Sequence, residues 1–196
     1  MRPTLLLASN SPRRRELLRE AGFDFEIAGS SVVERFDVDF TLRELTALNA
    51  IRKAMATARV QSGKVVLAAD TLVAIDDDVL GKPSNAGEAV AMLERLSGRA
   101  HEVCTSVFVC HLARARSASF HVISHVYFHR LSRDQIGNYL TRVNPLDKAG
   151  AYAAQGSGKE IIEKIVGSYT NVVGLPMEKT IPALAEFGIE PKPQKT

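Results

Sequence analysis

A strand, a polar turn and the start of a helix follow one another in Leu5-Leu6-Leu7-Ala8-Ser9-Asn10-Ser11-Pro12-Arg13-Arg14-Arg15-Glu16-Leu17-Leu18. The apolar run predicts the end of a buried strand, and a hydroxyl cap with Pro12 in the first turn predicts the helix start. Backbone N–H groups at a helix start favour an anion, and guanidinium groups form charge-assisted hydrogen bonds to phosphate oxygens. This stretch therefore predicts a phosphate-binding turn. A capped helix with a solvated basic face is the alternative.

The alternation of strands and helices continues along the chain. Helices are predicted over residues 12–21, 41–60, 84–98, 132–143 and 176–187; those at Thr41 and Ser132 begin with capping boxes, and Ser84 caps the third. Strands are predicted over residues 4–8, 23–28, 65–75, 79–80, 102–112, 120–128 and 161–166. The sequence therefore predicts an α/β fold with a mixed sheet, and the two longest late strands as antiparallel neighbours.

Length and composition narrow the class of protein. A chain of 196 residues with 45% apolar and 24% charged residues is predicted to form one globular domain over residues 1–196, with a frayed tail at 190–196. A net charge of +3 is too small for a dedicated nucleic-acid binder, so no stable nucleic-acid partner is expected. No apolar run approaches the ~18 residues of a membrane span. No signal peptide is expected, because the first residues lack the apolar region and the cleavage site of one. No membrane association is expected.

Two cysteines, Cys104 and Cys110, lie six residues apart in one predicted strand. Their side chains share a face but stand roughly 20 Å apart at about 3.3 Å per residue, so they cannot pair within that strand. Buried, reduced thiols with a structural role are therefore predicted, rather than a redox role. Reduced thiols are typical of the cell interior, so a cytoplasmic location is expected.

Asp70 is the strongest catalytic candidate. It interrupts the apolar run Val65–Ile75, which has the composition of a central strand covered on both faces. An ionised carboxylate in such a strand costs several kcal/mol unless a cation or metal compensates it. A metal ligand or general base is therefore predicted, and an acid that caps a turn through Thr71 is the alternative.

Two lysines are further candidates for anion binding. Lys82 lies in the rigid loop Gly81-Lys82-Pro83 soon after the central strand, where it can act as a point charge on a phosphate. Lys53 lies on an alanine-rich helix face that a ligand could approach. A solvated surface charge is the alternative for each.

Three other patterns do not carry chemistry. Gly156-Ser157-Gly158-Lys159 lacks the first glycine and the final Ser/Thr of a P-loop. His121, His125 and His129 lie in a predicted strand, where successive members stand about 13 Å apart, too far to share a metal with ~2 Å bonds, and they are expected on the solvent face. No motif for a covalent nucleophile is present. The cations, the single strand acid and the glycine-rich loops instead favour metal-assisted attack of water on a phosphate chain.

Five blocks of sequence, in this order, resemble the Maf family of nucleoside triphosphate pyrophosphatases. They are Ser9-Asn10-Ser11-Pro12-Arg13-Arg14 with Glu16-Leu17-Leu18, Ala69-Asp70-Thr71, Gly81-Lys82-Pro83, Asp147-Lys148-Ala149-Gly150-Ala151-Tyr152 with Gln155-Gly156, and Ile165-Val166-Gly167-Ser168-Tyr169 with Asn171-Val172-Val173-Gly174-Leu175-Pro176. The resemblance implies an elongated mixed sheet flanked by helices, in two lobes around a central cleft, as in the inosine triphosphate pyrophosphatases.

The resemblance also implies an activity and its residues. The family hydrolyses a nucleoside triphosphate to the monophosphate and pyrophosphate with a divalent ion, usually Mg²⁺, with Mn²⁺ or Co²⁺ as substitutes. Asp70 matches the family's proton acceptor, and Glu34 together with Asp70 matches its metal-binding acids. The positions that match phosphate contacts are Ser9, Arg13, Arg14, Lys53 and Lys82. The positions that match substrate choice are Arg13, Thr71 and Gln155.

The loop that carries Gln155 resembles the branch of the family that acts on dTTP and UTP, and a side-chain amide can pair with the O4 and N3–H edge of thymine or uracil. Two positions depart from the family pattern: Val33 stands where a second acid is usual, and Ile51 replaces an arginine. The resemblance also implies a homodimer. A pyrophosphatase for 7-methyl-GTP or non-canonical purine triphosphates, and a non-catalytic nucleotide-binding regulator, are the alternatives.

Overall fold

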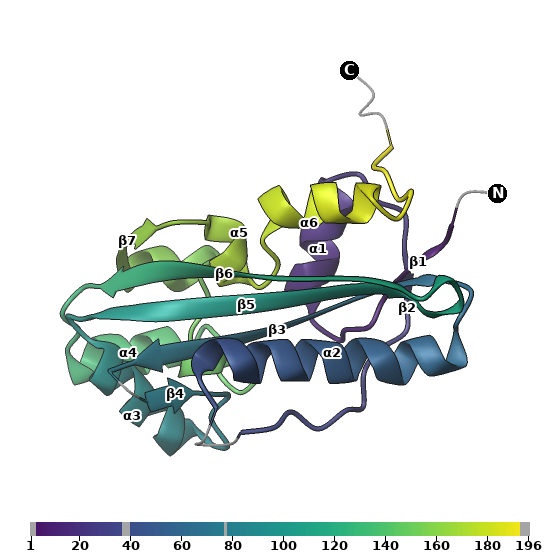
Figure 1. Cartoon of the computed structure of the whole chain (residues 1–196). Coiled ribbons are helices and arrows are strands. Elements are labelled where there is room, and N and C mark those ends of the chain that lie inside the picture. The colour runs from purple at the N-terminus through teal and green to yellow at the C-terminus, as the bar shows by residue number, and fades with distance from the viewer. Residues whose placement is uncertain (1–2, 37–39, 77, 193–196) are drawn as a thin grey trace.

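A mixed sheet of seven strands with helices on both faces forms the protein in the computed structural model, which describes residues 3–36, 40–76 and 78–192 (Figure 1). The strands are β1 (Leu5–Leu7), β2 (Glu26–Ile27), β3 (Val65–Ile75), β4 (Asp78–Leu80), β5 (Ala100–His111), β6 (Arg116–Phe128) and β7 (Ile162–Val166). The helices are α1 (Pro12–Glu20), α2 (Leu42–Val60), α3 (Ala86–Leu96), α4 (Arg133–Leu140), α5 (Tyr169–Val173) and α6 (Met177–Ala185). Short 3₁₀ turns cover Leu112–Arg114, Ala149–Ala151 and Gly156–Glu160.

The order of the strands is β2-β1-β3-β5-β6-β7, and β4 pairs with β3. β1 runs parallel to both β2 and β3, whereas β3, β5, β6 and β7 are antiparallel neighbours. The predicted α/β class, the mixed sheet and the antiparallel β5–β6 pair are therefore confirmed. The last four residues of the predicted tail lie outside the described residues.

Helix α2 covers one face of the sheet, and the remaining helices cover the other (Figure 1). Alternate residues of β3 divide between the two faces: Val66 and Ala68 pack with the alanines of α2, whereas Val65 and Leu67 pack with the apolar side of α1 and α6. Farther along the same face, α3 and α4 cover Val73 and its neighbours. Because β3 is buried on both faces, its near-continuous apolar sequence is explained.

The central strand β3 changes its neighbour halfway along. Its first part pairs with β1 up to Leu67, and its last part pairs with β4 from Val73 onward. Between these two points, within the residues that the structure describes, β3 has a strand partner only on the β5 side, where Asp70 pairs with Ser106. The sheet is therefore open beside Asp70 and Thr71, and polar side chains can reach the strand there.

Several local predictions are confirmed and one is wrong. The capping boxes at Thr41 and Ser132 both form. Ser84, however, does not cap α3: Asn85 does, accepting from the backbone N–H of Glu88 at 2.9 Å, while the Ser84 hydroxyl donates to the Glu88 carboxylate. Serine and asparagine are both favoured N-cap residues, so the sequence Ser84-Asn85 alone does not show which of the two caps the helix. Helix α5 was not predicted.

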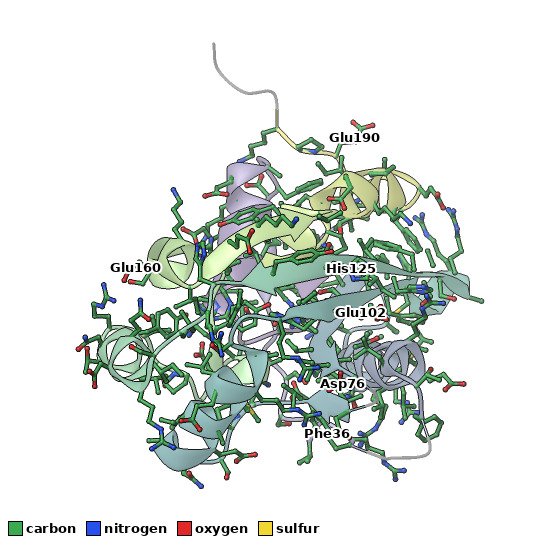
Figure 2. The ribbon with its side chains drawn as sticks, turned by 90° about the vertical axis from the view of Figure 1, so that its left-hand side faces the viewer. Phe36, Asp76, Glu102, His125, Glu160 and Glu190 are labelled. Carbon is green, nitrogen blue, oxygen red and sulfur yellow. The ribbon has the colours of Figure 1, made fainter. Side chains whose placement is uncertain are left out.

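The predicted strand positions of His121, His125 and both cysteines are confirmed, whereas His129 lies one residue beyond the strand. His121 and His125 lie on β6 and are exposed, as is His129 just beyond it. Figure 2 shows His125 near Glu102 of β5, its partner in the sheet register. Both cysteines are buried and free. Among the described residues, no helix is long and apolar enough to cross a membrane.

Candidate active site

The turn between β1 and α1 directs small polar groups toward the opening in the sheet. Ser11 caps α1, accepting from the backbone N–H of Arg14 at 3.4 Å, and Pro12 occupies the first turn as predicted. Ser9 is buried, and its hydroxyl accepts from the backbone N–H of Ser11 at 3.2 Å. The start of α1 thus presents backbone donors and fixed positive charge at one place, which is the arrangement that an anion needs.

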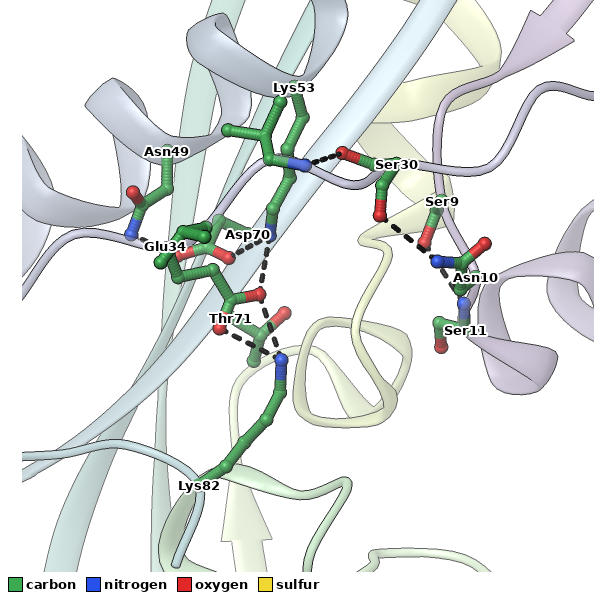
Figure 3. A network of polar contacts seen from close by, with 12 residues as sticks. Ser9, Asn10, Ser11, Ser30, Glu34, Asn49, Lys53, Asp70, Thr71 and Lys82 are labelled. Atoms are coloured by element: carbon green, nitrogen blue, oxygen red, sulfur yellow. Dashed lines mark hydrogen bonds and ion pairs between the residues drawn. The ribbon is translucent and has the colours of Figure 1, made fainter. Parts of the chain in front are cut away.

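A cavity of about 520 Å³ lies where the sheet opens. Its lining contains eight of the nine predicted site residues: Ser9, Arg13, Arg14, Glu34, Lys53, Asp70, Thr71 and Lys82. They come from α1, α2, β3 and three loops, so residues far apart in sequence meet in one cavity. Part of this group is drawn in Figure 3.

Arg14 is buried and holds its guanidinium against neutral oxygens. Its Nε donates to the carbonyl of Gly174 at 2.8 Å, its Nη1 to the hydroxyl of Ser9 at 3.3 Å, and its Nη2 to the hydroxyl of Thr71 at 3.0 Å. No carboxylate forms an ion pair with it among the described residues, and burial lowers the pKa of Arg14. A buried cation that contacts only neutral groups is poised for an anion from the cavity.

Asp70 projects from β3 toward α2 and is almost fully buried. Its Oδ1 lies 2.5 Å from the ammonium of Lys53, and its Oδ2 accepts from the side-chain amide of Asn49 at 3.1 Å. Lys53 and Asn49 lie four residues apart on α2, so they share one helix face. The charge inside the apolar strand is thus compensated, as the sequence required.

Glu34 joins both lysines from the loop that precedes α2 (Figure 3). Its Oε1 lies 2.7 Å from Nζ of Lys53, and both its oxygens lie 2.8 Å from Nζ of Lys82. Lys53 therefore stands between two carboxylates, those of Glu34 and Asp70. In this cluster, the two lysines predicted to bind phosphate are each bonded to a carboxylate of the protein.

Burial and the lysines shift the two carboxylates in opposite directions. Burial raises the pKa of Asp70 and outweighs the opposing attraction of Lys53. Burial also acts to raise the pKa of Glu34, but the ammonium of Lys53, followed by that of Lys82, overcomes it and holds the pKa at about 2. Asp70 is thus the stronger base of the pair, and Glu34 is the more firmly ionised.

Arg13, in the lining of the cavity, contacts the loop after α4. Its Nη1 donates to Oδ2 of Asp147 at 3.0 Å and its Nη2 to the backbone carbonyl of the same residue at 3.1 Å. Lys148 donates to the other oxygen of Asp147 at 2.5 Å. The predicted phosphate-binding Arg13 is therefore held at two points by Asp147 in this structure, once by the carboxylate and once by the backbone carbonyl.

Gln155 is the predicted site residue that the structure does not bring into the cavity lining. Its side-chain amide donates to Glu16 of α1 at 3.4 Å, on the outer side of the helix start. Tyr152, three residues earlier in the same loop, does line the cavity. The loop itself therefore borders the cavity, and the role of Gln155 in substrate choice stays a prediction.

Two contributions to the site were missed at the level of sequence. The first is Asn49, which contacts Asp70. Its position, one turn before Lys53 on a helix face rich in alanine, could have indicated a role in the site. Thr105 on β5 shares a hydrogen bond of 2.8 Å with Thr71 and is fixed in turn by Asn171 of α5. No sequence signal marked this second chain of contacts, because it depends on the strand register.

The acidic residues suit a hard divalent cation. In the part of the chain that the structure describes, no group of three or more His, Cys, Asp or Glu side chains is placed to hold a metal ion. Glu34 and Asp70 supply two carboxylates around one positive charge, the ammonium of Lys53. Mg²⁺ is commonly bound by one or two carboxylates, with phosphate oxygens and water as its other ligands, so this donor set fits it.

Comparison with known proteins identifies one family, and the relatives described below share one name. Residues 4–187 match the family model described as Maf-like protein. A protein of Desulforamulus reducens named dTTP/UTP pyrophosphatase is 43% identical over 97% of this chain and 99% of its own length. A protein of Bacillus cereus with the same name is 41% identical over 95% of this chain and 91% of its own length. The solved structure of the Staphylococcus aureus Ham1 protein is 17% identical, covers 93% of this chain and 98% of its own, and gives a TM-score of 0.47.

Proposed function

Because this chain belongs to the Maf-like protein family, we propose that it is a nucleoside triphosphate pyrophosphatase that hydrolyses dTTP and UTP to the monophosphate and pyrophosphate. Relatives more than 40% identical over nearly the whole chain carry the name dTTP/UTP pyrophosphatase. Residues from each of the five blocks that resemble the family line one cavity. The proposal therefore rests on the family and on the chemistry of the site together.

One observation supports it most directly. The buried guanidinium of Arg14, bonded only to neutral oxygens, faces the same cavity as the buried carboxylate of Asp70. A site that binds a phosphate chain and activates water needs a cation without a carboxylate partner and a base at close quarters. A structural ion pair would instead have joined the two charges directly.

The residues divide the chemistry as follows. Arg14, Ser9 and the start of α1 hold phosphate oxygens, and Lys53 and Lys82 turn from Glu34 to the phosphates. Asp70 accepts the proton of a water molecule whose oxygen attacks the α-phosphorus. The bond from the α-phosphorus to the oxygen that bridges to the β-phosphate breaks, and pyrophosphate leaves with that oxygen. A raised pKa makes Asp70 a better proton acceptor than an ordinary aspartate.

Glu34 and Asp70 would hold a divalent ion, for which Mg²⁺ is proposed, with Mn²⁺ or Co²⁺ as substitutes. When bound, such an ion neutralises charge on the phosphate oxygens. Val33, beside Glu34, is exposed and apolar, so it adds no ligand. The remaining ligands are expected from phosphate oxygens and water.

The preference for a pyrimidine base is proposed to come from Arg13, Thr71 and Gln155. Gln155 offers a donor and an acceptor to the base edge once it leaves Glu16. Following the family resemblance, we also propose that the enzyme is a homodimer in the cytoplasm. Buried free thiols at Cys104 and Cys110 are consistent with a reducing compartment.

A panel of triphosphates tests the proposal. Pyrophosphate release is measured with dTTP, UTP, CTP, dGTP, dITP and 7-methyl-GTP at saturating Mg²⁺. The expected result is the highest kcat/KM for dTTP and UTP. A preference for 7-methyl-GTP or dITP would assign the purine branch, and binding without release under single-turnover conditions would assign a regulator.

A further inference from the structure

The side-chain amide of Asn49 links the carboxylate of Asp70 to the backbone of Arg35, the residue after Glu34. It is fully buried on α2. Its Nδ2 donates to Oδ2 of Asp70 and to the backbone carbonyl of Arg35, each at 3.1 Å, and its Oδ1 accepts from the backbone N–H of Arg35 at 2.8 Å. Both amide hydrogens and the carbonyl oxygen are thus used, and Figure 3 shows the bond to Asp70.

The contact with Arg35 imitates the pairing of one strand with another. The side chain satisfies both the N–H and the C=O of a loop residue that has no strand partner there. Arg35 directly follows Glu34, whose carboxylate reaches Lys53 and Lys82. Fixing the backbone at residue 35 therefore fixes the origin of the Glu34 side chain.

We propose that Asn49 is a positioning residue that sets Asp70 and Glu34 relative to each other, by holding the Asp70 carboxylate and the backbone beside Glu34 with one buried amide. The consequence for metal use rests on the proposed function, since it assumes that these two carboxylates hold the divalent ion. Residues that orient metal ligands from behind typically contribute about 10- to 100-fold to metal affinity or activity.

Substitution by leucine keeps the side-chain size and removes all three hydrogen bonds. Thr46 provides a matched control because it is also buried on α2, one turn earlier, and donates or accepts a 2.7 Å hydrogen bond with Ser106. Thr46 does not line the cavity or contact either carboxylate. Asn49→Leu and Thr46→Val therefore both delete a buried polar contact of the same helix, but only the first removes contacts with the site.

Two readouts separate positioning from general stability. The first is hydrogen exchange of the Arg35 backbone amide by NMR, which needs neither substrate nor metal. The second is the Mg²⁺ concentration that gives half-maximal pyrophosphate release from dTTP, measured together with kcat and KM. If Asn49→Leu does not fold, Asn49→Ser serves in its place, since water can then reach the buried groups.

The expected result is faster exchange at Arg35 and a half-maximal Mg²⁺ concentration about 10- to 100-fold higher in the Asn49 variants, with both quantities unchanged in Thr46→Val. An unchanged Mg²⁺ requirement in an active Asn49 variant would overturn the inference, as would equal shifts in Thr46→Val. If the wild-type protein releases no pyrophosphate from any triphosphate, the proposed function fails; Arg35 exchange that is the same in wild type and Asn49 variants overturns the positioning role independently.

Discussion

The ammonium of Lys53 lies 2.5 Å from Oδ1 of Asp70, and both side chains are buried. A buried ion pair is weak evidence of stabilisation, because removing both charges from water offsets much of their attraction. Here the pair also lines a cavity that contains a second buried cation, Arg14. Three buried charged side chains around one cavity are better explained by a catalytic site than by a contribution to the stability of the fold.

Replacement of Asp70 by asparagine should remove turnover while leaving nucleotide binding largely intact. The amide keeps the size and hydrogen-bonding reach of the side chain but cannot accept a proton from water. General bases typically contribute about 10²- to 10⁴-fold, so a loss of kcat in that range is expected. Pyrophosphate release from dTTP gives kcat, and calorimetry with a non-hydrolysable dTTP analogue gives the affinity.

Asp76→Asn is the control for this substitution. Asp76 is exposed, lies just beyond β3 and pairs with Arg99 away from the cavity, so its variant should retain wild-type kcat. Turnover by Asp70→Asn at the rate of Asp76→Asn would refute the assignment of Asp70 as the proton acceptor.

Replacement of Arg14 by lysine should weaken binding of inorganic pyrophosphate. Arginine directs three nitrogens at Gly174, Ser9 and Thr71, a planar arrangement that an ammonium group cannot reproduce. Hydrogen bonds to charged groups contribute about 1.5–3 kcal/mol, which predicts a roughly 10- to 100-fold rise in Kd. Calorimetry in the presence of Mg²⁺ measures it.

The neighbouring Arg15→Lys is the matched control. Arg15 follows directly on α1 but bonds to the backbone of Asn10 and does not line the cavity. Its variant should bind pyrophosphate as the wild type does. Equal Kd values for the two variants would show that Arg14 has a structural role only.

The effect of Gln155→Ala tests base recognition. If the amide hydrogen-bonds to the base edge, its loss should reduce the ratio of kcat/KM for dTTP over dGTP by roughly 2- to 12-fold, because one hydrogen bond contributes about 0.5–1.5 kcal/mol. The matched control is Glu16→Gln, which changes the partner of Gln155 in this structure without changing the base-reading group. A ratio that stays constant in Gln155→Ala would remove Gln155 from substrate choice.

Much of the site was accessible from local sequence, because each signal was local. Asp70 stood out as one acid in an apolar strand, and the start of α1 stood out by its cap, proline and arginines. Capping boxes placed the starts of α2 and α4, since a cap depends on residues within one turn.

The connections between these parts were not accessible. The opening beside Asp70 arises because β3 exchanges β1 for β4, which depends on topology. Arg13 meets Asp147 across 134 residues, and Asn49 meets Arg35 through a loop that no periodic pattern describes. Sequence patterns can indicate such residues individually, but which residues pair depends on how distant elements pack against each other.

His101 should make the stability of the protein depend on pH. It is buried on β5, its Nε2 lies 2.8 Å from the hydroxyl of Tyr152, and its ring packs edge-on against Phe128 and Tyr152. Nδ1 of His101 is buried without a hydrogen-bond partner among the described residues. Burial therefore lowers the pKa of His101 from 6.5 to about 4.

The direction of the effect follows from that lowered pKa. Between pH 6.5 and 4 the unfolded chain binds a proton at His101 that the folded protein does not, so stability is full above pH 6.5 and falls as the pH drops toward 4. At pH 5 the loss is about 2 kcal/mol from this residue. Urea unfolding of wild type and His101→Gln at pH 7 and pH 5 measures it, and the variant should lose about 2 kcal/mol less. His125→Gln, on the exposed face of β6, should keep the wild-type loss, and the same loss in His101→Gln would show that another group titrates.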